Sequence, residues 1–124
     1  MSYVQSHKVS VTTSGAGAAT TYTGGLINGH VDAIRYVKTD FADGSTITIT
    51  GENTGIAILA ETGINASATR YPRAATQDII GVASCYAAGA EPVECKVAIA
   101  DERIKIVVAS GGATKTGVFY ILTS

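Results

Sequence analysis

The sequence predicts an all-β protein, specifically an antiparallel β-sandwich with a jelly-roll-like fold, and three observations support this class. Residues with β-branched side chains are abundant, with 16 Thr, 13 Ile and 11 Val against only 3 Leu, and such side chains favour strands over helices. Several segments alternate apolar and polar residues with the two-residue period of a strand. These segments are short and are separated by glycine-rich turns, whereas a parallel α/β fold would need helical patterns between its strands.

The length predicts one domain. A chain of 124 residues fits a single ordinary domain and is long enough to bury a core without a metal or a disulfide. No repeat and no change of composition divides it. We assign residues 8–124 to the sandwich and residues 1–7, which lack a strand or helix pattern, to an N-terminal arm.

Eight strands are expected in chain order. Alternation is most regular in residues 8–12 and 45–50. Residues 117–122 are apolar at every position but the first, which predicts a central or a sandwiched strand. The other segments are bounded by glycine or by turns containing Asp or Asn. The eight predicted strands are residues 8–12, 19–23, 31–38, 45–50, 56–61, 96–99, 103–108 and 117–122.

Two of these strands are expected to form a hairpin. Residues 96–99 and 103–108 both alternate, and Asp101 and Glu102 lie between them in the position of a turn. The pattern therefore predicts a two-stranded ribbon in this part of the chain.

Residues 71–93 fit a strand pattern worst and are predicted to form a long loop. The segment contains Pro72, Pro92 and many small residues. A long loop in a compact domain is commonly functional or packed against a partner. Within it, residues 77–86 could form a further strand or a short helix, and this alternative stays open at the level of the sequence.

Charge and hydropathy narrow the classes of partner. Nine basic and ten acidic side chains give a net charge of −1 without any block of like charge. The sequence therefore has no cluster of basic residues of the kind that binds nucleic acid. No apolar run approaches the roughly 20 residues that cross a bilayer. The first eight residues lack the features of a secretory signal, and synthesis in the cytoplasm is expected.

No motif predicts catalysis, a cofactor or a metal. His7 and His30 are the only histidines, and no Gly-x-Ser-x-Gly nucleophile motif occurs. Asp32, Asp40 and Asp43 lack the spacing of a calcium loop and are interpreted as solvated turn carboxylates. An enzyme would need one of the histidines beside a carboxylate and a nucleophile, so a protein without catalytic activity is the expectation.

The two cysteines, Cys85 and Cys95, are ten positions apart. A protein of the cytoplasm normally keeps its thiols reduced, so both are expected to be free and partly buried. Two cysteines without nearby histidines are also too few for structural zinc.

The aromatic residues favour a role in the core or in contacts with other proteins. The chain has six tyrosines and no tryptophan, and tyrosine is common both at interfaces and at the rim of a core. A sugar-binding module, with Tyr36, Tyr71 or Tyr86 as stacking platforms, is a competing hypothesis. The predicted interface residues lie in the arm and the long loop: Ser2, Tyr3, Val4, Gln5, Tyr71 and Tyr86.

Five segments carry a resemblance that covers most of the chain. Residues 34–44, 47–50, 64–73, 103–107 and 111–117 resemble small β-rich virion proteins of tailed bacteriophages, and the closest similarity is to capsid decoration, or cement, proteins with jelly-roll-like folds. These segments are strands and turns without catalytic motifs, so no site residue is transferred from the family.

The resemblance implies a structural role on a virus particle. A decoration protein binds the outside of the head shell and bridges subunits of the major capsid protein. Because unpaired edge strands of a sandwich promote aggregation, we also expect a homo-oligomer, a dimer or a trimer at a symmetry axis of the capsid. A head-fibre, neck or tail protein involved in host attachment is the alternative within the same group. The expected location is therefore the outer capsid surface of the virion, after synthesis in the bacterial host.

Overall fold

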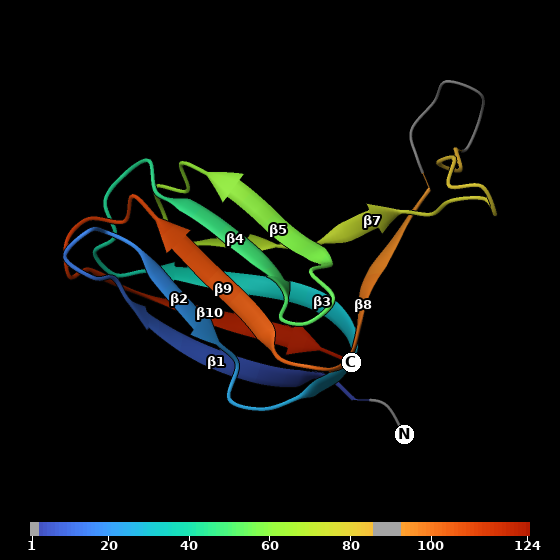
Figure 1. Cartoon of the computed structure of the whole chain (residues 1–124), viewed down its shortest axis with the longest axis horizontal. Helices are drawn as coiled ribbons and strands as arrows, with labels where there is room; N and C mark the ends of the chain where they lie inside the picture. Colours follow the sequence, from blue (N-terminus) through green and yellow to red (C-terminus); the bar gives the residue numbers. More distant parts are fainter. Residues whose placement is uncertain (1–2, 86–92) are drawn as a thin grey trace.

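The structure is a computed structural model that describes residues 3–85 and 93–124, and all regular secondary structure in these residues is β (Figure 1). The described part of the chain forms ten strands. Their bounds are Gln5–Thr12 (β1), Ala19–Tyr22 (β2), Ile27–Lys38 (β3), Thr46–Gly51 (β4), Ala57–Thr62 (β5), Ala68–Arg70 (β6), Arg73–Ala75 (β7), Glu94–Glu102 (β8), Ile104–Ala109 (β9) and Thr116–Thr123 (β10).

The strands form two antiparallel sheets that face each other (Figure 1). The first sheet has the order β1-β10-β3-β8-β7, and β6 pairs with the part of β3 that β8 leaves free. The second sheet has the order β2-β9-β4-β5. Most neighbours are distant along the chain, so the fold depends on long-range pairing that no short segment can form alone.

Alternate side chains from both sheets point into one shared core. In β4, Ile47 and Ile49 are fully buried, and the intervening threonines are half-exposed. In β9, Ile104, Ile106 and Val108 are buried in the same way. This alternation is what a sheet with one buried face requires, and it explains why Ile, Val and Thr dominate the composition.

Three aromatic rings form the centre of the core. Tyr36 of β3 stacks on Phe119 of β10, with ring centroids 5.0 Å apart, and on Phe41, with centroids 6.1 Å apart. Burial raises the pKa of the Tyr36 hydroxyl. A Cβ at Gly117 would lie 2.6 Å from the Phe41 ring, so only glycine leaves room for this ring. Tyr36 is therefore a core residue and offers no platform to a sugar.

β10 lies between β1 and β3, as expected for a central strand. Phe119 and Ile121 fill its inner face and are completely buried. Val118, Tyr120 and Leu122 point to the outer face of the first sheet and are half-buried. The outer face is thus only partly covered by its neighbours in the described structure.

The hairpin predicted around Asp101 and Glu102 is wrong. β8 pairs with β3 and β7 in the first sheet, whereas β9 pairs with β2 and β4 in the second. The chain crosses between the sheets at Arg103, after Asp101 adopts a left-handed φ of 54°. Both strands alternate because each turns an apolar face to the same core from opposite sides, and alternation alone cannot separate this arrangement from a hairpin.

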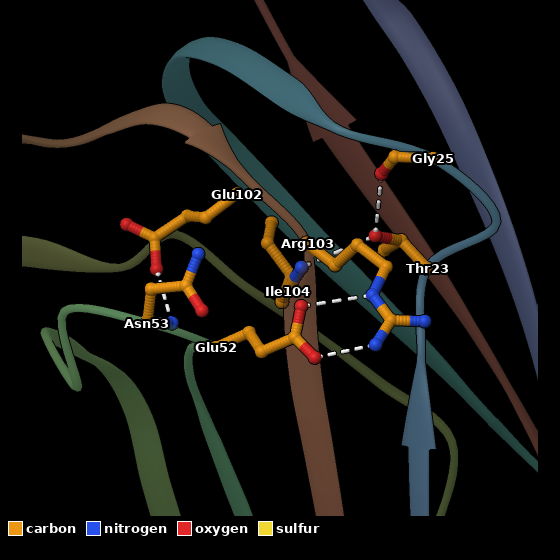
Figure 2. Close-up of polar contacts among 7 residues, drawn as sticks. All are labelled: Thr23, Gly25, Glu52, Asn53, Glu102, Arg103 and Ile104. Carbon is orange, nitrogen blue, oxygen red and sulfur yellow. Dashed lines mark hydrogen bonds and ion pairs between the residues drawn. The ribbon is translucent and has the colours of Figure 1, made fainter.

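Glu102 holds the crossover in place (Figure 2). Its carboxylate is almost fully buried and accepts hydrogen bonds from the backbone N–H of Asn53 (2.8 Å) and Thr54 (3.0 Å) and from the Thr54 hydroxyl (2.9 Å). These bonds, that of the Thr54 amide first, hold the pKa of Glu102 below its ordinary value. The end of β8 is thereby joined to the turn between β4 and β5.

Arg103 strengthens the link between the crossover and the turn after β4 (Figure 2), and it also contacts β2. Its guanidinium donates to both carboxylate oxygens of Glu52, at 2.8 Å from Nε to Oε1, and lies 4.3 Å from the centroid of the Tyr22 ring. The Arg103 bond holds the pKa of Glu52 below its ordinary value. The Thr23 hydroxyl accepts from the Ile104 amide and donates to the Gly25 carbonyl. All these polar groups are occupied within the fold.

All eight predicted strands are present, with ends that differ by at most four residues. β6 and β7 were not predicted, because three-residue strands are too short to show a period. The N-terminal arm expected over residues 1–7 is shorter, since Gln5 to His7 pair with Thr123 to Ile121 in β1 and β10. None of the described residues belongs to a helix with the length and apolarity needed to span a membrane.

Replacing the central aromatic ring tests the shared core. Phe119→Ala should lower the free energy of unfolding by about 3–5 kcal/mol, because the lost ring leaves a cavity beside the Tyr36 ring. Urea denaturation followed by circular dichroism measures the change. The exposed Leu26 (62% exposed) provides the control, since Leu26→Ala should change stability by about 0.5 kcal/mol or less. Equal losses in both variants would contradict this description of the core.

Acid should weaken the crossover through Glu102. Because its pKa is lowered in the folded protein, its contribution to stability is complete above the ordinary glutamate pKa of about 4.3 and is lost as the pH falls through the lower folded value. Glu102→Gln should therefore be less stable than the parent at neutral pH, and the difference should shrink in acid. Urea midpoints between neutral pH and pH ~3 provide the measurement, and a difference that grows in acid would refute the assignment.

Candidate functional site

A two-stranded ribbon projects away from the two sheets and is the most distinctive feature of the surface (Figure 1). We define the ribbon as residues 73–85 together with residues 93–96. β7 pairs with the first residues of β8, with Arg73 opposite Lys96 and Ala75 opposite Glu94. The Thr76 amide donates to the Val93 carbonyl (2.8 Å) and continues the ladder. β8 thus belongs to the first sheet at one end and to the ribbon at the other.

The far end of the ribbon is an ordered turn. Gln77 and Ala83 form a β-bridge, and the Asp78 amide donates to the Val82 carbonyl (2.9 Å). One carboxylate oxygen of Asp78 accepts from the amides of Ile80 and Val82, each at 3.0 Å. An aspartate that bonds to the following backbone in this way stabilises a tight turn, so the local sequence specifies the shape of the turn.

This turn presents three apolar side chains to solvent. Ile79 is fully exposed, Ile80 is 80% exposed and Val82 is 56% exposed. We call these three residues the apolar tip. Single exposed apolar side chains are common, but three of them within four residues of one hydrogen-bonded turn are a candidate interaction site.

The base of the ribbon is anchored to β3. Lys96 Nζ lies 2.5 Å from Asp32 Oδ1, and the Arg73 guanidinium donates to the Asp32 carbonyl (3.1 Å). The bond to Lys96 is the main reason why the pKa of Asp32 lies below its ordinary value. The interpretation of Asp32 as a solvated turn carboxylate is wrong, because the residue lies within β3 and its side chain is only 18% exposed.

Both cysteines lie on the ribbon. Cys95 is in β8 opposite Ala74, and Cys85 follows the tip. They are free, as predicted, but both are exposed and not partly buried. The reason is the projection of the ribbon, which removes this part of the chain from the core.

The predicted interface residues fall in two places. Tyr3 (64% exposed) and Val4 (61%) precede β1, and the Gln5 amide group donates to the Tyr3 hydroxyl (3.2 Å). Tyr71 (67% exposed) lies between β6 and β7, next to the base of the ribbon. Ser2 and Tyr86 lie outside the described residues. The structure therefore brings Tyr3 and Gln5 together and places Tyr71 beside the ribbon.

The apolar tip itself was not among the predicted interface residues. Its signal in the sequence is the pair Ile79 and Ile80, which lies between Asp78 and Gly81 and so falls inside a turn. Two large apolar residues in a turn cannot both reach a core, so this pattern could have identified them. The sequence predicts only that these residues lie in a long loop, of a kind that is commonly functional or packed against a partner.

Compared with models of protein families, curated proteins and solved structures, the chain matches none. Within residues 3–85 and 93–124, no group of three or more His, Cys, Asp or Glu side chains is placed to hold a metal ion. The functional assignment therefore depends on the surface of the protein itself.

Removing the anchor should loosen the ribbon without unfolding the domain. In Asp32→Ala the Lys96 ammonium loses its partner, so the amide hydrogens of Ala74 and Cys95 should exchange with solvent faster than in the parent. Amide exchange of the core strands should stay the same. The control is Asp43→Ala, which removes the exposed ion pair with Lys38 and should change neither rate. Unchanged exchange in the ribbon of Asp32→Ala would show that the ion pair is no anchor.

Proposed function

We propose that this protein is a bacteriophage capsid decoration protein that binds the outside of the head shell and stabilises it by bridging major capsid subunits. The observation that carries the proposal is the apolar tip on its anchored ribbon. A ribbon that is already folded and fixed at its base loses little conformational freedom on binding, and its exposed isoleucines can fill an apolar pocket of a partner. The resemblance of the sequence to phage virion proteins supplies the kind of partner.

We further propose that the two sheets form a β-sandwich of the jelly-roll type. The support is the strand order. When the short strands β6 and β7 are set aside, the remaining eight strands, numbered in chain order, run 1-8-3-6 in one sheet and 2-7-4-5 in the other. Eight antiparallel strands in two facing sheets with these crossovers correspond to the paired Greek keys of a jelly roll. The ribbon is then an insertion between the fifth and sixth of those strands.

Bridging provides the stabilisation. A protein that binds the assembled shell but not the separated subunits stabilises the shell by mass action, by about 2.7 kcal/mol at a hundredfold excess over its dissociation constant. Contacts with more than one subunit strengthen each other, because the second contact is made within an already bound complex. Tyr3 and Val4 before β1 and Tyr71 beside the ribbon provide exposed side chains for such additional contacts.

The proposal assigns the protein to the outer surface of the virion. In this role the partners are the major capsid protein and further copies of the same chain, and neither nucleic acid, membrane nor cofactor takes part. No reaction is required, since the effect on the shell comes from binding alone.

Rebinding to phage heads that lack the protein tests this function. The parent should bind such heads in regular numbers and raise the temperature at which they release DNA. Ile79→Asp with Ile80→Asp should reduce occupancy by about tenfold or more, because a charge placed in an apolar contact loses its water. Leu26→Asp is the matched control, since Leu26 is an exposed apolar residue away from the ribbon, and it should bind like the parent.

Three outcomes would contradict the proposal. Absence of binding to heads at any concentration would overturn the decoration role. Binding to tails or necks alone would support the alternative role in host attachment. Equal binding by the tip variant and the parent, with both folded by circular dichroism, would show that the apolar tip is not the contact.

A further inference from the structure

The edge strands that residues 3–85 and 93–124 form differ in how far they are protected from pairing with another strand. β2 has four residues, and β7, at the end of the first sheet, has only three. β5 faces a register shift at Ile49 and Thr50 of β4, and Glu61 of β5 forms a two-bonded ion pair with Arg70 of β6 across the edge. Short strands, bulges and charges at the edge all discourage further pairing.

β1 lacks most of these protections. It has eight residues, no proline and an uninterrupted register with β10. Lys8 is the only Lys, Arg, Asp or Glu residue of β1. Among the described strands, β1 is therefore the longest regular edge, and an edge of this kind is a template for another strand.

The register shows which backbone groups of β1 are available. The Thr13 amide donates to the Lys115 carbonyl of the segment that leads into β10. In an antiparallel ladder, backbone groups of alternate residues point to the same neighbour, so the odd-numbered residues of β1 bond to β10. The even-numbered residues point their N–H and C=O groups outward, and within residues 3–85 and 93–124 no strand pairs with that side. These residues are Ser6, Lys8, Ser10 and Thr12.

We propose that this edge pairs with β1 of a second copy of the chain, antiparallel and about a two-fold axis at Val9. The first sheets of the two copies then become one continuous sheet, and the outward groups of the four even-numbered residues bond to each other. The proposed function includes self-association, and this inference names the interface through which it occurs. The dimer does not depend on the capsid role, because it is expected of the purified protein alone.

The side chains of β1 select this register. Val9 faces Val9 of the second copy on the inner side, and Lys8 faces Ser10 of the second copy on the outer side. A shift of two residues one way would place Lys8 opposite Lys8, and like charges directly opposite each other are destabilising. The same shift the other way would leave the start of β1 opposite the turn after Thr12. A shift of one residue would turn inner side chains outward.

A second copy is the occupant that this edge fits best. A two-fold interface must be self-complementary, so that each residue meets its partner in both directions. β1 meets this condition from Ser6 to Thr12 in the Val9-centred register. On the inner side Val9 faces Val9 and His7 faces Val11, and on the outer side the neutral Ser10 faces Lys8. The strand of an unrelated partner would have no reason to match this pattern.

Replacement of one outward amide tests the dimer. Ser10→Pro removes an N–H that points away from β10, and an edge strand tolerates proline at such a position. Ser10→Ala is the matched control, because it changes the side chain but keeps the N–H. Sedimentation equilibrium should show a dimer for the parent and for Ser10→Ala. In Ser10→Pro the dissociation constant should rise by about tenfold or more, since each dimer loses two hydrogen bonds.

Amide exchange of the unmodified protein provides a second test that does not depend on the folding of a variant. The amides of Val9 and Val11 should be protected at all concentrations, because they bond to β10. Those of Lys8 and Ser10 should become protected only as the concentration rises through the dissociation constant of the dimer. A parent that stays monomeric, or a dimer in which Lys8 and Ser10 remain unprotected, would overturn the proposal. Loss of the dimer in Ile79→Asp with Ile80→Asp, but not in Ser10→Pro, would assign the interface to the apolar tip instead.

Discussion

Each sheet of this protein has one apolar face, and burying the two faces against each other is the constraint on which the rest of the structure depends. The strands alternate, so one residue in two contributes to the core, and the fully buried positions are filled almost entirely by Ile, Val and Phe. A one-residue slip of any strand would expose these side chains and bury their polar neighbours. The core therefore sets the register of the strands, and the register in turn decides which backbone groups are free at the edges.

Charged side chains at the edge of this core form ion pairs and hydrogen bonds that join the two sheets. Arg70 and Glu61 join the two sheets where β6 passes β5, and Glu102 and Arg103 join them where the chain crosses from β8 to β9. In each case a carboxylate is matched by two or more donors, which satisfies its oxygens where water is partly excluded. These contacts hold the ends of the strands so that the apolar faces stay aligned.

The two proposed interaction surfaces lie at places where one chain does not bury its apolar side chains or pair its strand edge. The ribbon leaves the first sheet at Asp32 and ends in apolar side chains that its own core cannot cover. β1 ends the same sheet on the other side with a row of backbone groups that point outward. An apolar turn recognises a pocket through side chains, whereas a sheet edge recognises a strand through its backbone. The two surfaces suit different partners, and both are held by the same rigid body.

The all-β class and eight strands could be predicted from the sequence, because a period of two and the preference of β-branched residues for strands are local properties. The apolar character of β10 on both faces also indicated its central place. Which strands pair with each other could not be predicted in the same way. Residues 96–99 and 103–108 alternate like a hairpin yet belong to opposite sheets, since the burial of Glu102 under the turn between β4 and β5 is a contact between residues far apart in the chain. Likewise, Ile79 and Ile80 resemble any apolar pair in the sequence, and only the departure of the ribbon from the core, anchored by Lys96 on Asp32, leaves them in solvent.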